Sequence, residues 1–425
     1  MSSVSAESVL KDVFGFDGFR GRQLEIIDHV LSGHNVLTVM PTGAGKSLCF
    51  QVPGLMRDGL TIVVSPLISL MQNQVEALKL FGVEAATINS TISPEEAREV
   101  WKKVRSGSLK FLYVSPEKLM TEQMLDQVDE LNISLFAIDE AHCISQWGAA
   151  FRPEYEELAF LHRRYSKVPI IALTATADHG TREEICEKIF SGNVKSFLSG
   201  FDRPNIGLNV EIKAGWKQQL LKFMKDRPKE NGIVYCLSRK KTEEAAKTLN
   251  ESGYHALAYH AGMGGDVREI NLNRFMAEPD LIMVATIAFG MGIDKPDIRF
   301  VFHTDLPSSP EAYYQEIGRA GRDGEPATAH MLYGLDDIRM RRMFIDNEAA
   351  SSDHKRRSHQ RLNELLSYAE APECRRVTLL RYFGDDPDFK KCGNCDLCIN
   401  PRDTVIAIEA AQKFLSAVYL LEQLF

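Results

Sequence analysis

The sequence has no apolar run that approaches the ~18 residues required of a membrane-spanning helix, so we expect no association with membranes. Its first residues, MSSVSAESVL, lack a basic patch followed by an apolar stretch, which argues against a secretory signal. There is also no excess of positive charge, because 50 lysines and arginines stand against 58 aspartates and glutamates. A basic groove can coexist with such an acidic exterior, so nucleic-acid binding stays open. These absences predict a cytoplasmic globular protein.

A length of 425 residues exceeds what one compact core accommodates, so two or three domains are expected. Short apolar runs alternate with amphipathic stretches such as 67–81, a pattern typical of a parallel sheet covered by helices. The pattern restarts after Pro204, which predicts two α/β lobes with a junction near 201–205. The strand-like runs are 36–40, 60–65, 111–115, 135–138 and 170–174, then 232–237, 255–260, 281–286, 300–304 and 329–333.

A glycine-rich segment follows the first strand-like run and precedes a helix-like run: Pro41-Thr42-Gly43-Ala44-Gly45-Lys46-Ser47. This context predicts a phosphate-binding loop, in which backbone N–H groups and the helix N-terminus attract phosphates. Lys46 would reach the β- and γ-phosphates of ATP, and the Ser47 hydroxyl would ligate Mg²⁺, with Thr42, Gly43 and Gly45 as further cofactor-binding residues. Met40 stands where the general pattern has its first glycine, so the alternative is a chance Gly-Lys-Ser in a loop.

An acidic pair, Asp139-Glu140, closes the apolar run 135–138 and is followed by Ala141 and His142. Carboxylates at the C-terminal end of a parallel strand lie at the edge of the sheet where ligands bind. Asp139 would hold Mg²⁺, and Glu140 would polarise the attacking water. Such a pair alone is often a solvated turn, but together with the Gly-Lys-Ser segment it predicts ATP hydrolysis.

The eight cysteines fall into two groups. Scattered thiols in apolar or strand-like surroundings are interpreted as ordinary buried cysteines of a reducing compartment: Cys49, Cys143, Cys186 and Cys236. The others are clustered near the C-terminal end: Cys374, Cys392, Cys395 and Cys398. Four thiolates can enclose a structural Zn²⁺ tetrahedrally, with no open position for chemistry. An iron–sulfur cluster also uses four cysteines, so the spacing leaves both metals open.

With these motifs the chain resembles superfamily 2 helicases, and more narrowly the RecQ family of DNA helicases, from about Leu10 to its last residue. The most specific strings are AFGMGID at 288–294 and QEIGRAGRDG at 315–324. The resemblance implies two tandem RecA-like lobes that close on ATP, followed by a helical subdomain whose four cysteines bind Zn²⁺. It also implies that Arg322 is an arginine finger and Arg319 a supporting phosphate contact. Gly292, Asp294 and Gln315 would add to nucleotide binding. The alternative for the arginines is a surface salt-bridge pair.

The resemblance extends to segments that would contact the base and the DNA. Phe14-Gly15-Phe16, Phe19-Arg20 and Gln23 resemble the adenine-reading motif, with Phe16, Arg20 and Gln23 as the contacts. Ser65-Pro66-Leu67 and Ser115-Pro116-Glu117 resemble motifs that grip the DNA backbone through Ser65 and Ser115. Thr174-Ala175-Thr176 resembles the motif that links the state of ATP to lobe movement. Each signal is weak alone, because small hydroxyl residues are common caps.

Residues 144–155 resemble the family's aromatic-rich loop, which senses single-stranded DNA and couples it to ATP hydrolysis. In this loop Trp147 and Phe151 would stack on bases, and Arg152 would hold phosphate. Ala149 and Ala150 stand where the family usually has His and Asp. This departure bears on DNA-stimulated hydrolysis more than on ATP binding.

The expected domains are lobe 1 over 1–203, lobe 2 over 204–338, a zinc subdomain over 339–402 and the beginning of a winged helix over 403–425. The resemblance implies 3′ to 5′ movement on single-stranded DNA and duplex unwinding in repair and recombination, at the nucleoid if the protein is bacterial. Because the strand-splitting hairpin of RecQ proteins often lies in the winged helix, we expect ATPase activity with impaired unwinding. The alternatives are an RNA helicase with the same motor and a nucleic-acid-binding scaffold with an inactive nucleotide site.

Overall fold

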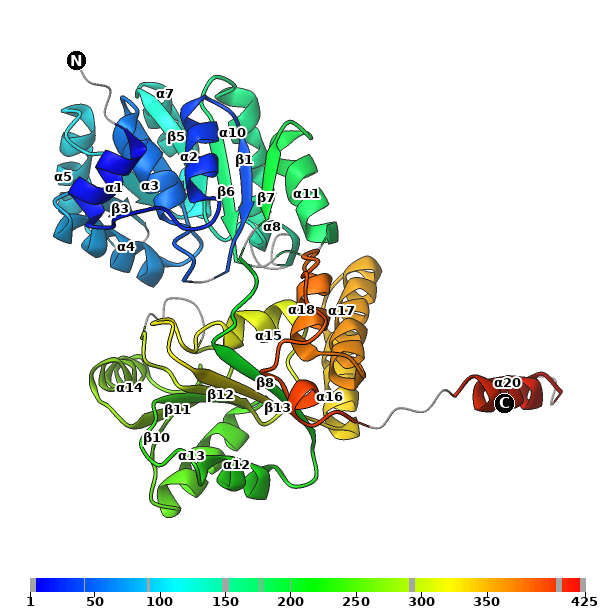
Figure 1. Cartoon of the computed structure of the whole chain (residues 1–425). Helices are drawn as coiled ribbons and strands as arrows, with labels where there is room; N and C mark the ends of the chain where they lie inside the picture. Colours follow the sequence, from blue (N-terminus) through cyan, green and yellow to red (C-terminus); the bar gives the residue numbers. More distant parts are fainter. Residues whose placement is uncertain are drawn as a thin grey trace.

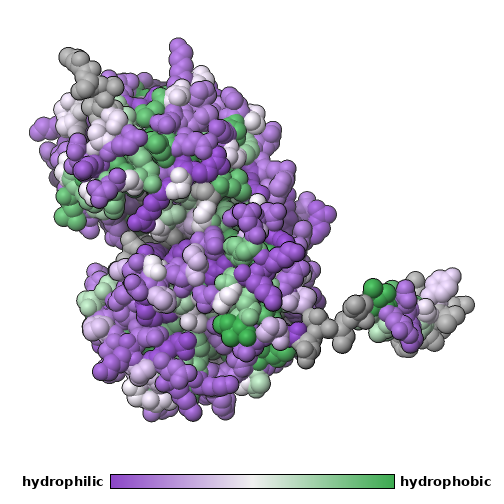
Figure 2. All heavy atoms as spheres, in the orientation of Figure 1, coloured by the Kyte–Doolittle hydropathy of each residue, from purple (hydrophilic) through white to green (hydrophobic). Residues whose placement is uncertain are grey.

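The computed structural model of the chain describes residues 5–41, 43–89, 92–146, 153–175, 177, 179–198, 200–289, 295–402 and 407–420. Within these residues two parallel sheets form two lobes, one above the other in Figure 1. Figure 2 shows that hydrophilic side chains cover most of the visible surface and that the outline narrows between the lobes. None of the helices in the described ranges is long and apolar enough to cross a bilayer.

Lobe 1 is built on a seven-stranded parallel sheet in the order β3 (Ala85–Ile88), β4 (Phe111–Val114), β2 (Leu60–Val64), β5 (Ile133–Ile138), β6 (Ile170–Thr174), β1 (Val36–Val39) and β7 (Lys195–Leu198). Its helices are α1 (Ala6–Phe14), α2 (Gln23–Leu31), α3 (Leu48–Met56), α4 (Ile68–Leu80), α5 (Pro94–Arg105), α6 (Pro116–Leu119), α7 (Glu122–Asp129), α8 (Cys143–Gln146), α9 (Pro153–Glu157), α10 (Ala159–Arg164) and α11 (His179–Phe190). Neighbouring residues of β1, Val36 and Leu37, are fully buried in different apolar clusters. Helices therefore cover both faces of the sheet, which explains the continuous apolar runs in the sequence.

Lobe 2 repeats this plan with a six-stranded parallel sheet in the order β10 (His255–Tyr259), β11 (Leu281–Ala285), β9 (Gly232–Tyr235), β12 (Phe300–His303), β13 (Ala327–Tyr333) and β8 (Ile206–Ile212). Its helices are α12 (Trp216–Met224), α13 (Arg239–Glu251), α14 (Gly265–Ala277) and α15 (Pro310–Ile317). The predicted α/β class with two parallel-sheet lobes is confirmed.

All ten strand-like runs identified in the sequence are strands of these two sheets, and the amphipathic stretch 67–81 is α4. Three strands were missed: β3, β7 and β8. They lie at the edges of the two described sheets, where one side of each strand has no neighbouring strand. These strands mix buried residues with half-buried or exposed ones, so they lack the continuous apolar run by which the central strands were identified.

A helical subdomain follows lobe 2 and consists of α16 (Leu335–Asn347), α17 (Ser352–Glu370), α18 (Arg375–Tyr382) and α19 (Asp396–Ile399). Helix α16 spans the expected boundary at residue 338. The subdomain lies beside lobe 2 and reaches α11 of lobe 1, where Arg182 Nη1 donates to the Phe383 carbonyl at 2.8 Å (Figure 1). Of the expected winged-helix segment the structure describes 407–420, in which α20 (Ile408–Leu420) forms, and the winged-helix assignment stays a prediction.

Candidate nucleotide cleft and metal centre

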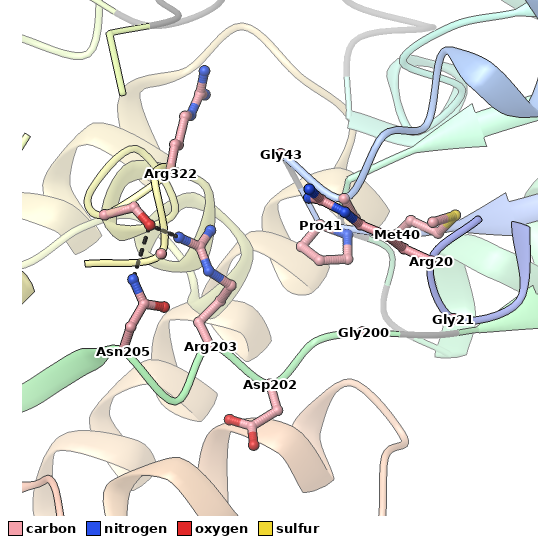
Figure 3. A pocket seen from close by; sticks show the side chains of 13 residues that line it. Arg20, Gly21, Met40, Pro41, Gly43, Gly200, Asp202, Arg203, Asn205 and Arg322 are labelled. Carbon is pink, nitrogen blue, oxygen red and sulfur yellow. Dashed lines mark hydrogen bonds between the residues drawn. The ribbon is translucent and has the colours of Figure 1, made fainter. Parts of the chain in front are cut away.

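The phosphate loop joins β1 to α3 at the edge of the lobe 1 sheet that faces lobe 2 (Figure 3). Gly43 and Gly45 have positive φ angles of 85° and 77°, a conformation that favours glycine. A side chain at residue 45 would also place its Cβ 2.5 Å from Gln23 Nε2. Lys46 and Ser47 are half-buried directly before α3, and Thr42 lies outside the described residues. The loop therefore has the backbone that close approach to phosphates requires.

Helix α2 braces this loop through Gln23, which is almost fully buried. Its Nε2 donates to the carbonyls of Ala44 at 2.9 Å and Gly45 at 3.1 Å, and its Oε1 accepts from Arg20 N at 2.8 Å. The Arg20 side chain lines a cavity of about 300 Å³ beside the loop, whereas Phe16 is 47% exposed and is not among the described lining residues. Adenine contacts of Phe16, Arg20 and Gln23 stay a prediction.

The acidic pair lies at the carboxyl end of β5, next to the phosphate loop. Asp139 is buried, its N–H donates to the Val64 carbonyl at 2.8 Å, and its carbonyl accepts from Tyr155 Oη at 2.6 Å. Glu140 has a positive φ of 50°, which is rare for a residue with a side chain. Backbone strain of this kind is concentrated at functional sites. The neighbouring strand β6 contributes Thr174, whose Oγ1 lies 2.8 Å from His142 Nδ1.

The two carboxylates differ in acidity. Burial and the negative charge of Glu140 raise the pKa of Asp139 to about 6. Burial also opposes ionisation of Glu140, but the imidazole of His142, 3.2 Å from Glu140 Oε2, and the charges of Lys46 and Arg319 outweigh it and lower the pKa of Glu140. A divalent cation at Asp139 would favour its ionised form. The site thus offers one carboxylate suited to a cation and one that stays charged beside the cleft.

The arginine loop, residues 318–325, follows α15 in lobe 2 and forms the opposite wall of the cleft. Arg322 Cγ lies 3.9 Å from the position that a Cβ on Gly43 would occupy, and the cavity is lined by residues of both lobes (Figure 3). Arg319 is largely buried, and its charge acts on Glu140 of lobe 1. Gln315 is half-buried on α15, while Gly292 and Asp294 lie outside the described residues. The structure therefore places Arg322 beside the phosphate loop, and Arg319 is near enough to the acidic pair for its charge to act on Glu140.

The residues predicted to grip DNA lie away from this cavity along the same edge of the sheet. Ser65 and Ser115 follow Val64 and Val114, which are paired in register on the adjacent strands β2 and β4. Ser65 is buried and its Oγ has no hydrogen-bond partner among the described atoms, whereas Ser115 is half-buried at the start of α6. Trp147, Phe151 and Arg152 lie outside the described residues, as do Ala149, Ala150 and Thr176.

The four clustered cysteines converge, and their Sγ atoms all lie within 4.8 Å of one another. The Cys392–Cys398 and Cys395–Cys374 sulfurs are 4.0 and 3.9 Å apart. A tetrahedron of Zn–S bonds requires sulfurs roughly 3.8 Å apart. Backbone N–H groups of Cys392 and Asn394 approach Cys374 Sγ at 3.4 Å and Cys392 Sγ at 3.3 Å, which are contacts of the kind that orient sulfur ligands around a metal. An iron–sulfur cluster would hold the sulfurs farther apart, because several irons lie between them.

Two residues of the linker between the lobes were not identified from the sequence. Arg203 and Asn205 line the cavity and hydrogen-bond to the backbone of the arginine loop. The available signal was slight: two polar residues flank Pro204 in the predicted junction. Tyr155, whose hydroxyl donates to the Asp139 carbonyl, lies within the segment 144–155 that resembles the DNA-sensing loop, and this contact was not predicted.

Comparison with known families finds three matches along the chain. Residues 20–185 match the DEAD/DEAH box helicase family, 216–324 match the helicase conserved C-terminal domain, and 335–399 match the RecQ zinc-binding family. The ATP-dependent DNA helicase RecQ of Haemophilus influenzae is 44% identical over 421 residues, covering 99% of this chain and 68% of the relative. The chain belongs to the RecQ family. The Bacillus subtilis RecQ is 39% identical over 427 residues, covering 99% of this chain and 71% of the relative.

Membership makes the chain an ATP-dependent helicase of the RecQ type, with the four-cysteine cluster as its zinc site. The chain spans about two thirds of the length of these bacterial RecQ relatives. The solved structure of the helicase MrfA bound to DNA has a TM-score of 0.65 at 17% identity, covering 91% of this chain and 60% of that one. This similarity supports the two-lobed fold.

Proposed function

We propose that the RecQ chain is an ATP-driven motor that moves 3′ to 5′ on single-stranded DNA, with ATP bound between lobe 1 (1–203) and lobe 2 (204–338). The observation that carries the proposal is the approach of Arg322 to Gly43, 3.9 Å from Arg322 Cγ to an ideal Cβ position, across a cavity that both lobes line. A triphosphate on the phosphate loop would face the arginine loop, so closure of the lobes and hydrolysis would be coupled.

Each charged group of the cleft has a place in this hydrolysis. Lys46 and the backbone N–H groups near Gly43 and Gly45 hold the β- and γ-phosphates. Ser47 and Asp139 would hold Mg²⁺, which when bound neutralises charge on the phosphate oxygens. Glu140 orients and polarises the attacking water, and its lowered pKa keeps it ionised for this role. Arg322 stabilises charge on the transferred γ-phosphoryl group as the finger, and Arg319 supports it.

The DNA path would follow the carboxyl edge of the lobe 1 sheet, from Ser115 and Ser65 to the aromatic-rich segment 144–155. His142 and Thr174 connect this edge to the acidic pair, since the imidazole contacts both Thr174 Oγ1 and Glu140 Oε2, at 2.8 and 3.2 Å. The zinc subdomain (339–402) would form a platform for DNA beside lobe 2, and 403–425 would begin a winged helix. Duplex unwinding, a role in repair and recombination, and a cytoplasmic location near the nucleoid extend the proposal from the RecQ relatives to this chain.

The proposal is tested by ATP turnover with and without single-stranded DNA, with single-stranded RNA as a second polymer. We expect stimulation by DNA, reduced in extent by Ala149 and Ala150, and weaker stimulation by RNA. Lys46→Ala should abolish turnover, whereas Lys102→Ala, at an exposed position on α5, should not change it. A Lys46→Ala protein that hydrolyses ATP like the parent would contradict the motor and favour a scaffold. Duplexes with 3′ or 5′ single-stranded tails, assayed in parallel, test direction and unwinding.

A further inference from the structure

The arginine loop follows α15, and its backbone carbonyls are not paired within a helix or a sheet. Side chains from the linker between the lobes satisfy these carbonyls. Arg203 Nη2 donates to Ala320 O and Gly321 O, both at 2.9 Å, and Arg203 Nη1 donates to Gly318 O at 3.4 Å. One of these carbonyls belongs to the residue before Arg319, and the other two belong to the residues between Arg319 and Arg322. Arg203 therefore holds the backbone that carries both arginines.

Asn205 completes this attachment from the other side of Pro204. Its Nδ2 donates to Gly321 O at 2.8 Å (Figure 3) and to Glu325 O at 2.9 Å. Gly321 has a positive φ of 56°, and a Cβ there would lie 2.4 Å from Asn205 Nδ2. A glycine is therefore required at this point of the loop, both by its conformation and by the closeness of the Asn205 amide.

The linker is itself a firm support for these side chains. Asn205 directly precedes β8, and its carbonyl accepts from Ala327 N at 2.9 Å, where β8 pairs with β13. On the other side, the Phe201 carbonyl accepts from Tyr314 Oη at 2.8 Å, and the Phe201 ring stacks on Phe383 of the zinc subdomain at 4.9 Å. Both ends of the segment 201–205 are therefore fixed to lobe 2 and the zinc subdomain.

We propose that Arg203 and Asn205 are positioning residues for ATP hydrolysis, because they fix the arginine loop so that Arg322 meets the phosphate loop. The proposal rests on the proposed role of Arg322 as the finger. Neither residue needs to touch ATP for this effect. A displacement of about 1 Å in a reacting group can reduce a rate by about 10²-fold. Loss of the hydrogen bonds from Arg203 and Asn205 would therefore lower the rate by moving the Arg322 guanidinium.

The test is a double-mutant cycle on kcat for ATP. Arg203→Ala should lower kcat by about 10- to 100-fold while KM changes by less than about threefold, since the phosphate loop is untouched. Asn205→Ala removes two hydrogen bonds and should lower kcat less. In the Arg322→Ala background, Arg203→Ala should lower kcat by a much smaller factor than in the parent, because the finger is gone and only the support from Arg319 is left to displace. Single-turnover release of radiolabelled phosphate makes these low rates measurable.

Arg57 provides a matched control, since this arginine also caps backbone carbonyls but lies in lobe 1. It donates to Ser134 O at 2.9 Å, Val30 O at 3.3 Å and Leu31 O at 3.2 Å. Any effect of Arg57→Ala on kcat should be the same factor in the parent and Arg322→Ala backgrounds, because it arises from stability alone. Arg203→Lys, which keeps a donor but loses the fork of two Nη atoms, should restore part of the rate.

Two results would overturn the inference: an unchanged kcat in Arg203→Ala and Asn205→Ala, or equal losses in both backgrounds. If Arg203→Ala does not fold, Asn205→Ala in the same cycle decides the question, because its loss of kcat should be larger in the parent than in the Arg322→Ala background if the inference holds. An Arg322→Ala protein with the kcat of the parent is a different failure. It would contradict the finger in the proposed function, and the positioning role would fall with it.

Discussion

The two walls of the nucleotide cleft are held in place differently. The phosphate loop is fixed by nearby sequence: β1 and α3 flank it, two glycines shape it, and Gln23 braces Ala44 from 21 residues away. The arginine loop is fixed from far away, by Arg203 and Asn205, which lie 117 and 116 residues from their partners Ala320 and Gly321. Because the phosphate loop is fixed locally, it can bind phosphate in any position of the other lobe. The arginine loop is fixed through the linker and changes position when the linker does, which suits a loop that responds to lobe movement.

The largest effects should come from removing one charge on each wall. Lys46→Ala should reduce both the affinity for a non-hydrolysable ATP analogue and the turnover of ATP. Arg322→Ala should reduce kcat by about 10³-fold and leave the affinity for the analogue within about threefold, because a finger acts on charge that builds up in the transition state. Analogue binding by calorimetry and ATP turnover measure the two quantities. If Arg322→Ala loses affinity for the analogue as strongly as Lys46→Ala does, both loops contribute to nucleotide binding and the contrast between them is wrong.

Loss of zinc should affect the position of the arginine loop more than that of the phosphate loop. Arg376 in α18, two residues after Cys374, donates to Asp202 Oδ1 at 2.7 Å and to Ile206 O at 2.6 Å, and Asn394 Nδ2 donates to Pro204 O at 3.1 Å. Cys395→Ser or a strong chelator should unfold this support and lower kcat by about tenfold, with a smaller change in analogue affinity. The thermal midpoint should fall as well.

Cys186→Ser is the control for this experiment, because Cys186 is a half-buried thiol of lobe 1 outside the metal site. It should leave kcat and the metal content unchanged. Zinc analysis of each protein shows whether the treatment removed the metal. Equal losses of analogue affinity and kcat in Cys395→Ser would mean that the subdomain supports both walls alike.

A smaller effect is expected from distorting the phosphate loop itself. Gly45→Ala places a Cβ 2.5 Å from Gln23 Nε2 at a φ of 77°, so the loop must shift. We expect the analogue to bind about tenfold more weakly, which corresponds to about 1.4 kcal/mol. The double variant Gln23→Ala/Gly45→Ala removes the clash but not the unfavourable φ, and should recover part of the affinity. Recovery to the parent value would show that the glycine serves only to make room for Gln23.

The same contrast explains what could be predicted from the sequence. The phosphate loop, the acidic pair and the cysteine cluster depend on residues close together in the chain, so their spacing indicated them. The zinc site and the two-lobed α/β fold were confirmed. The attachment of the arginine loop depends on Arg203 meeting Gly321, a contact created by the pairing of β8 with β13. The polar residues that flank Pro204 do not indicate which partner they meet, and the positive φ of Glu140 likewise appears only in the folded chain.

The smallest effect on turnover should come from disrupting a buried ion-pair network that does not contact the arginine loop. Asp305, after β12, accepts from Lys213 Nζ at 2.7 Å and from Lys241 Nζ at 2.6 Å, and Lys213 also pairs with Asp337 of α16. This buried network joins the helical subdomain to lobe 2 but makes none of the contacts to residues 318–325. Asp305→Asn should therefore leave kcat within about twofold of the parent while lowering stability by about 2–4 kcal/mol.

The dependence of this stability on pH has a defined sign. Although burial opposes ionisation of Asp305, the charges and hydrogen bonds of Lys241 and Lys213 outweigh it and lower its pKa below the ordinary value. The ionised carboxylate therefore stabilises the fold at every pH above about 4, the pKa of an aspartate in the unfolded chain, and this contribution is lost as the pH falls toward the folded pKa. Thermal unfolding of the parent and Asp305→Asn should differ by a constant interval from about pH 8 to pH 5, and the interval should narrow below about pH 4. A large drop in the kcat of Asp305→Asn at neutral pH would show that any contact between the helical subdomain and lobe 2 affects the finger. An unchanged kcat would restrict that effect to the linker.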